Sequence, residues 1–192
     1  MKLQLQFLKS AILLLALSLL TAGCSGNLSY QTAMDKNRRN ISEMSKLQDA
    51  NFLAEAASYN LLKKQVADLG AERGYSSVLV NLAREKGEEF RDMEREINKL
   101  GRKKKFKVPA QMKMEHQTIF DRLSSSGQAD FDSEFVSVLQ DVTEEQTALY
   151  DEKSSEADDA DVRAFAARNL GFLRRHTDEI AKVDDQLMHT HR

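Results

Sequence analysis

Apolar residues recur at steps of three and four along four long segments of this chain, and almost nothing in those segments would break a helix. The 192 residues include one proline and no tryptophan, and 30% of them are charged. Such spacing places the apolar side chains on one face of an α-helix. Helices of this kind bury those faces against one another. The pattern therefore predicts an all-α fold: an antiparallel four-helix bundle with one additional short helix between the second and third long helices.

The glycines, the proline and the charged stretches set the expected helix boundaries. Gly101 is expected to end the second helix. Pro109 suits the first position of a helix, so the short helix is expected to begin there. An acidic segment, 151–161, separates the last two helices. The five expected helices span about 49–70, 76–100, 109–123, 131–149 and 162–187.

The first 24 residues carry a different signal. A short basic start precedes the apolar run 11–20, and small residues then lead to Cys24, the only cysteine. This order is typical of a secretory signal peptide. The run is also shorter than the roughly 20 residues that a membrane-spanning helix needs. We therefore expect residues 1–23 to be removed on export. With one cysteine no intramolecular disulfide can form, so packing alone must hold the fold.

The segment Thr21-Ala22-Gly23-Cys24 resembles the lipobox of bacterial lipoproteins; an ordinary signal peptide with an incidental cysteine is the alternative. The resemblance implies that Cys24 becomes the first mature residue and carries acyl chains, palmitate among them, on its sulfur and nitrogen. Two or three chains hold a protein at a membrane durably. Ser25 stands where an aspartate would favour the inner membrane. The expected location is therefore the periplasmic face of the outer membrane.

The residues after Cys24 are polar and show no sustained periodicity. We interpret 24–48 as the lipidated N-terminus and a tether, helical at most toward its end, and 49–192 as the bundle domain. A flexible chain of this length has a root-mean-square span of about 25–30 Å. The tether would then let the domain sit clear of the lipid surface.

Charge gives a weak indication of partners. Without residues 1–23 the chain has 26 basic and 30 acidic residues, which gives no footprint for nucleic acid. The membrane, through Cys24, and an unknown envelope protein or lipid are the expected partners. One basic corner could contact anionic lipid or lipopolysaccharide phosphate, although a solvated corner between helices also explains it. Its members are Arg102, Lys103, Lys104, Lys105 and Lys107.

No catalytic motif is present in the sequence. No histidine follows a glutamate by three residues, which excludes the Glu-x-x-His pairs of di-metal bundles. His-Glu-x-x-His, Gly-x-Ser-x-Gly and phosphate-binding glycine loops are also absent. We therefore expect a protein that is not an enzyme and has no cofactor.

His176 is the one histidine that the apolar spacing places inside the bundle, because it lies between Leu173 and Ile180. One interpretation is a core residue hydrogen-bonded to a neighbour such as Tyr59, Thr143 or Tyr150. The other is a metal ligand that acts with carboxylates. The carboxylates considered are Glu88, Glu89 and Glu145. By contrast, His116 is expected to be half-exposed on the short helix.

Taken in order, several segments resemble the bacterial family of domains of unknown function numbered 4142, which are exported, ferritin-like helical bundles. The resemblance covers about 49–187. Its carriers are Phe52-Leu-Ala-Glu-Ala-Ala57, Leu82-Ala83, Val108-Pro109, Phe131-Asp-x-x-Phe135, and Ala164-Phe-Ala166 through Leu173-Arg-Arg-His176.

The family pattern also suggests a metal site in the core, and this chain departs from it. The resemblance places Lys63 at the usual glutamate of the first helix, and Phe90 and Thr143 at the usual histidines of the second and fourth. Only His176 remains, and a bound ion needs at least three protein ligands. The resemblance therefore implies the fold without the metal chemistry.

These observations lead to one function hypothesis and two alternatives. We expect a non-enzymatic, lipid-anchored bundle that acts through its surface as an envelope interaction or stress-related protein. A metal- or oxidant-handling bundle that uses His176 is the first alternative. A carrier of small apolar ligands between the helices is the second.

Overall fold

The computed structural model describes residues 28–190, so the expected signal peptide and Cys24 lie outside the described residues. Between these limits the chain is helical and contains no strand, which confirms the all-α prediction. No helix in this range is long and apolar enough to cross a membrane. The helices are α2 (Tyr30–Asn40), α3 (Met44–Arg73), α4 (Ser77–Lys104), α5 (Met114–Ser124), α6 (Phe131–Glu156) and α7 (Ala160–Thr190).

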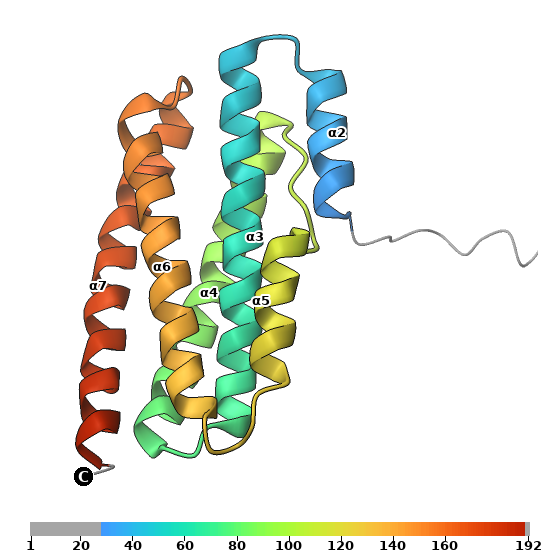
Figure 1. The fold of residues 1–192 in the computed structure, drawn as a ribbon. Coiled ribbons are helices and arrows are strands. Elements are labelled where there is room, and N and C mark those ends of the chain that lie inside the picture. The colour runs from blue at the N-terminus through green and yellow to red at the C-terminus, as the bar shows by residue number, and fades with distance from the viewer. Residues whose placement is uncertain (1–27, 191–192) are drawn as a thin grey trace, which may run out of the picture.

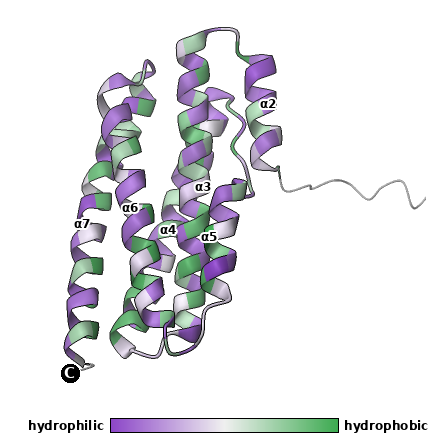
Figure 2. Ribbon diagram, in the orientation of Figure 1, coloured by the Kyte–Doolittle hydropathy of each residue, from purple (hydrophilic) through white to green (hydrophobic). Residues whose placement is uncertain are grey.

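The four long helices lie side by side, and the two short ones flank α3 (Figure 1). α3 packs against α4 and α6, and α7 packs against α6 and α4. α2 packs on α3, while α5 packs on α3 and α6. Figure 2 shows hydrophobic and hydrophilic residues interleaved along the long helices, as expected where one face of each is buried.

The apolar core divides into two clusters, one toward each end of the long helices. The first is built around Phe52, Tyr150 and Phe165, and the ring centroids of Phe52 and Tyr150 are 5.2 Å apart at an edge-on angle of 71°. The second contains Leu62 and Phe135 together with residues of α4 and α7. Both clusters draw on the apolar positions that the helical spacing predicted.

The N-terminal part of the fold differs from the expected tether. Residues 30–40 form α2, and α3 begins at Met44 rather than near residue 49. The Ser29 hydroxyl accepts a hydrogen bond from the Thr32 amide at 3.2 Å, which caps α2. α2 buries only Ala33 and Asn37. With so few buried positions it has no apolar stripe for the sequence to reveal.

The connection between α4 and α5 also differs from the expectation. α4 runs past Gly101 to Lys104 and ends with Lys105 in the left-handed conformation (φ 61°, ψ 26°). Gly101 serves close packing instead, because a Cβ there would collide with the Val108 side chain. Pro109 does not begin a helix, and α5 starts at Met114. Residues 105–113 instead run beside α2.

Candidate functional site

Buried polar side chains occur on every long helix, between the two apolar clusters on α4, α6 and α7 and beside Leu62 of the second cluster on α3. We call them the polar layer, and all are at most 2% exposed. On α6 they lie between Val142 of one cluster and Tyr150 of the other, and on α7 between Ile180 and Leu173. The layer consists of Asn60 and Lys63 of α3, Lys86 of α4, Thr143 and Gln146 of α6, and His176 of α7.

Lys63 is fully buried, and its ammonium group lacks a hydrogen-bond partner among the described residues. Its Nζ lies 4.8 Å from the centroid of the Phe90 ring, a cation–π contact. Burial lowers the pKa of Lys63 to about 7, and the positive charge of Lys86 acts in the same direction. The amine therefore titrates near neutral pH inside the protein, because burial disfavours its charged form.

His176 is also fully buried, which confirms that it faces the interior. Its ring stacks on Phe172, with centroids 6.1 Å apart, and the tilted Phe90 ring lies 5.2 Å away. Neither ring nitrogen is hydrogen-bonded within the described part of the chain, so the expected bond to Tyr59, Thr143 or Tyr150 is not formed there. Burial, followed by the charges of Lys63 and Lys86, lowers the pKa of His176 to about 2. The imidazole is neutral at physiological pH.

Lys86 forms ion pairs with two carboxylates beside the layer, those of Glu89 and Glu179. Its Nζ lies 2.6 Å from Glu89 and 2.5 Å from Glu179. Burial lowers the pKa of Lys86, but the hydrogen bonds to Glu179 and Glu89 outweigh that effect and raise it overall. Lys86 is therefore a charged, paired member of the layer, whereas Lys63 has no such partner in the part of the chain that the structure describes.

These residues do not fit a metal ion. The other two carboxylates considered with His176 are engaged elsewhere: Glu145 accepts from the Tyr59 hydroxyl at 2.9 Å, and Glu88 pairs with Arg91 at 2.9 Å. No group of three histidine, cysteine, aspartate or glutamate side chains within 28–190 is placed to hold a metal. Lys63 adds a cationic amine where a ligand would be needed. The layer is a set of enclosed polar groups, and we assign no catalytic step to it.

A second polar cluster lies beneath α5 and was missed from the sequence. His116 is 1% exposed rather than half-exposed, and its Nδ1 lies 2.8 Å from the Ser58 hydroxyl. The same hydroxyl accepts from the Lys113 amide at 2.9 Å. Lys113 also forms an ion pair with Glu55. Ser58 is fully buried. We therefore interpret the Ser58–His116 hydrogen bond as a structural contact that holds the start of α5 on α3, and not as a nucleophile with its base.

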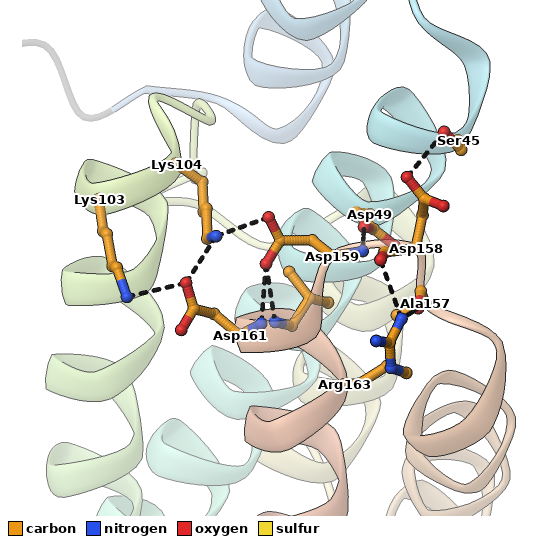
Figure 3. A network of polar contacts seen from close by, with 10 residues as sticks. Ser45, Asp49, Lys103, Lys104, Ala157, Asp158, Asp159, Asp161 and Arg163 are labelled. Atoms are coloured by element: carbon orange, nitrogen blue, oxygen red, sulfur yellow. Dashed lines mark hydrogen bonds and ion pairs between the residues drawn. The ribbon is translucent and has the colours of Figure 1, made fainter.

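The basic corner and the acidic segment, treated separately in the sequence, meet at one end of the bundle (Figure 3). Lys103 pairs with Asp161 at 2.8 Å, and Lys104 bridges Asp159 at 2.5 Å and Asp161 at 2.6 Å. Hydrogen bonds from Lys103 and Lys104 lower the pKa of Asp161 to about 2. Asp49 of α3 accepts from the Asp159 amide at 2.8 Å. Two of the five residues of the corner, Lys103 and Lys104, are thus neutralised by carboxylates at and just before the start of α7.

Helical spacing indicated His176, and the family pattern indicated Lys63, Phe90 and Thr143. The spacing of His116 to Ile119, Phe120 and Leu123 places it on the apolar face of the short helix, a signal that the expected half-exposure did not use. Asn60 and Gln146 are polar residues of a type that is usually exposed on a helix. Only the packing of the four long helices shows that they are buried.

Comparison with known proteins gives one finding. The family model described as "Domain of unknown function (DUF4142)" matches residues 34–183, which includes most of α2 and all of the polar layer. No curated protein and no solved structure matches the chain. The chain belongs to the DUF4142 family.

Proposed function

We propose that this chain is a lipid-anchored envelope protein, acylated at Cys24 and held at the periplasmic face of the outer membrane, which acts through its surface and not by catalysis. The observation that carries the proposal is the apolar run 11–20 followed by Thr21-Ala22-Gly23-Cys24. The long helices would form the antiparallel, ferritin-like bundle of the family.

The character of the core supports a surface role. The groups most suited to chemistry, Lys63 and His176, are fully buried and sit among aromatic rings. A reactant would have to part the helices to reach either side chain. An envelope interaction or stress-related role on the surface requires no such opening.

The test compares the wild-type chain with Cys24→Ser in a Gram-negative host. We expect labelled palmitate to enter the wild-type protein and the protein to fractionate with the outer membrane. Cys24→Ser should take up no label and leave the membrane fraction. Equal membrane association without label in both proteins would contradict the proposal.

Metal analysis of the purified protein is an independent test of the metal-handling alternative. We expect no stoichiometric iron, zinc or copper in the wild-type protein or in His176→Ala. Stoichiometric metal that His176→Ala abolishes would contradict a purely surface role.

A further inference from the structure

One side of the molecule carries a strong positive charge, although the chain as a whole is slightly acidic. We define the basic flank as residues 28–40, which include α2, together with the connection 105–113. Outside these segments, residues 28–192 have 20 lysines and arginines against 29 aspartates and glutamates. The flank has a single acidic residue, Asp35. Its six basic residues are Lys36, Arg38, Arg39, Lys105, Lys107 and Lys113.

The two segments of the basic flank form one surface because they are bonded to each other. Asn37 of α2 donates from Nδ2 to the Lys107 carbonyl at 3.0 Å and accepts from the Lys107 amide at 2.7 Å. At the other end of α2, the Ala110 amide donates to the Leu28 carbonyl at 2.8 Å. Figure 1 shows α2 and this connection on one side of α3, with α7 on the opposite side of the molecule.

Most cations of the basic flank are available for a partner. Lys113 is paired with Glu55, but the other five make no ion pair with any residue between 28 and 190. Arg38, Arg39, Lys105 and Lys107 are exposed. This distinguishes Lys105 and Lys107 from Lys103 and Lys104, which pair with the start of α7.

The point where the described chain begins places the basic flank near the expected anchor. Only three residues separate Cys24 from Leu28. Even a fully extended chain from Cys24 to Leu28 spans no more than about 14 Å. The axis of an 11-residue helix such as α2 extends roughly 16 Å further. An anchor at Cys24 would therefore hold the basic flank, and not the α7 side, next to the lipid.

We infer that the basic flank docks on the anionic phospholipid headgroups of the leaflet that holds the acyl chains. This inference rests on the proposed lipid anchor, which supplies the proximity. Each lysine or arginine near an anionic leaflet strengthens binding by roughly fivefold, and the effect fades within a Debye length of about 8 Å. Met114, which is 81% exposed at the start of α5, lies beside Ser29 in a shared groove and adds an apolar contact at the interface.

Lysine footprinting tests the docking directly. The full acylated protein is reconstituted into phosphatidylcholine vesicles with or without phosphatidylglycerol, treated with a small amine-acetylating reagent, and mapped by mass spectrometry. We expect acetylation of Lys105 and Lys107 to fall severalfold on the anionic vesicles and to recover in high salt. Lys182, exposed on α7, is the internal control and should not change. Equal acetylation of Lys105 and Lys107 on both vesicles would overturn the inference.

Two matched variants test whether the protection of Lys105 and Lys107 depends on the basic flank. Arg38→Glu/Arg39→Glu should restore the acetylation of Lys105 and Lys107 on anionic vesicles. Arg174→Glu/Arg175→Glu changes two adjacent exposed arginines on α7, of which Arg174 pairs with Asp151, by the same net charge and should leave the protection intact. Loss of protection in both variants would contradict docking through this flank. Protection that needs no vesicles and grows with protein concentration would assign the flank to a second copy of the chain and also contradict docking on lipid.

The intact mass of the same sample separates this inference from the proposed function. A mass without acyl chains would refute the anchor, and the unacylated protein would then be sedimented with the two kinds of vesicle. Binding to the anionic vesicles alone would still support docking of the basic flank on anionic headgroups. Binding to neither would overturn it, whatever the state of Cys24.

Discussion

Lys63 and His176 show how single residues can decide what a helical core is able to do. Each is fully buried, next to the Phe90 ring, and neither has a hydrogen-bond partner among the described residues. A buried polar group without a partner costs stability. Two such groups therefore make the folded protein less stable than an all-apolar core of the same shape would be. Their burial can instead fix the register of the helices, since sliding one helix would bring a polar group into an apolar cluster.

The pKa of Lys63 leads to a pH-dependent stability. The folded pKa is about 7 and the unfolded value is 10.5, so between these limits the unfolded chain binds a proton that the folded protein lacks. The free energy of unfolding should therefore rise with pH from about 7 to 9.5, by up to roughly 1.4 kcal/mol per pH unit. Lys63→Met should flatten this rise and stabilise the protein at pH 7 by roughly 2–4 kcal/mol.

Urea denaturation of wild type and Lys63→Met at several pH values measures how the free energy of unfolding depends on pH. The range stops below pH 10 because burial, with the Glu145 hydrogen bond, raises the pKa of Tyr59, and such a group gives the opposite slope above its unfolded pKa. Lys64→Met, at a partly exposed residue paired with Glu94, is the control and should keep the wild-type slope. An unchanged slope in Lys63→Met would show that Lys63 is not buried as described.

His176 should affect stability on the acid side. Its folded pKa of about 2 lies below the unfolded value of 6.5, so the unfolded chain binds the extra proton between these limits. Stability should fall as the pH drops below 6.5, and His176→Leu should lessen this fall while being tolerated or mildly stabilising at pH 7. Thermal unfolding at pH 7 and pH 5 measures both effects. Severe unfolding of His176→Leu at pH 7 would be inconsistent with a core role.

Phe90 is the apolar residue that contacts both groups, and it is fully buried as the family resemblance implied. Phe90→Ala should cost about 3–5 kcal/mol of unfolding free energy, because it leaves a cavity and removes the ring beside Lys63. Chemical denaturation gives the value. A loss below about 1 kcal/mol would mean that neighbouring side chains fill the space at little cost.

The elements differ in how well the sequence predicts them, for a physical reason. The long helices bury a continuous face, so their apolar spacing predicted them. The observed bounds of α4 and α6 differ from the expected bounds mainly at their C-terminal ends. α2 and α5 lie on the outside of α3, and each buries only two residues. What fixes α2 and the start of α5 is polar and distant in sequence: Asn37 with Lys107, and Ser58 with His116. Such contacts leave no periodic pattern in a single sequence. The apolar residues Ile119, Phe120 and Leu123 therefore predicted that α5 exists but not where it begins.

Asn37 should therefore control whether α2 stays attached. Its side chain satisfies both the amide and the carbonyl of Lys107, and it is 1% exposed. Asn37→Ala leaves both backbone groups unsatisfied, which should cost roughly 1–3 kcal/mol. The loss should appear as faster amide exchange within 28–40 while the long helices remain protected. Asn40→Ala, at the exposed end of α2, should exchange like the wild type; equal exchange in the two variants would contradict this role.

At the scale of the whole molecule, the order of α2 changes how the anchor would work. A flexible tether through residue 48 would let the bundle stand 25–30 Å from the lipid. With the described chain starting at Leu28, the link from Cys24 spans about 14 Å at most. The polar layer encloses Lys63 and His176 in the middle of the bundle. The cations of the basic flank that have no ion pair within 28–190 would lie near the proposed anchor. The proposed anchor at Cys24 would hold the bundle close against the membrane.

Neutron reflectometry of the acylated protein on a supported bilayer tests this account most directly, because it measures the height of the protein layer above the headgroups. We predict that the bundle begins within about 14 Å of the lipid surface. Asn37→Ala, which should release α2, should widen that gap. A solvent gap of 25 Å or more beneath the wild-type bundle, or no retained protein layer at all, would contradict the account.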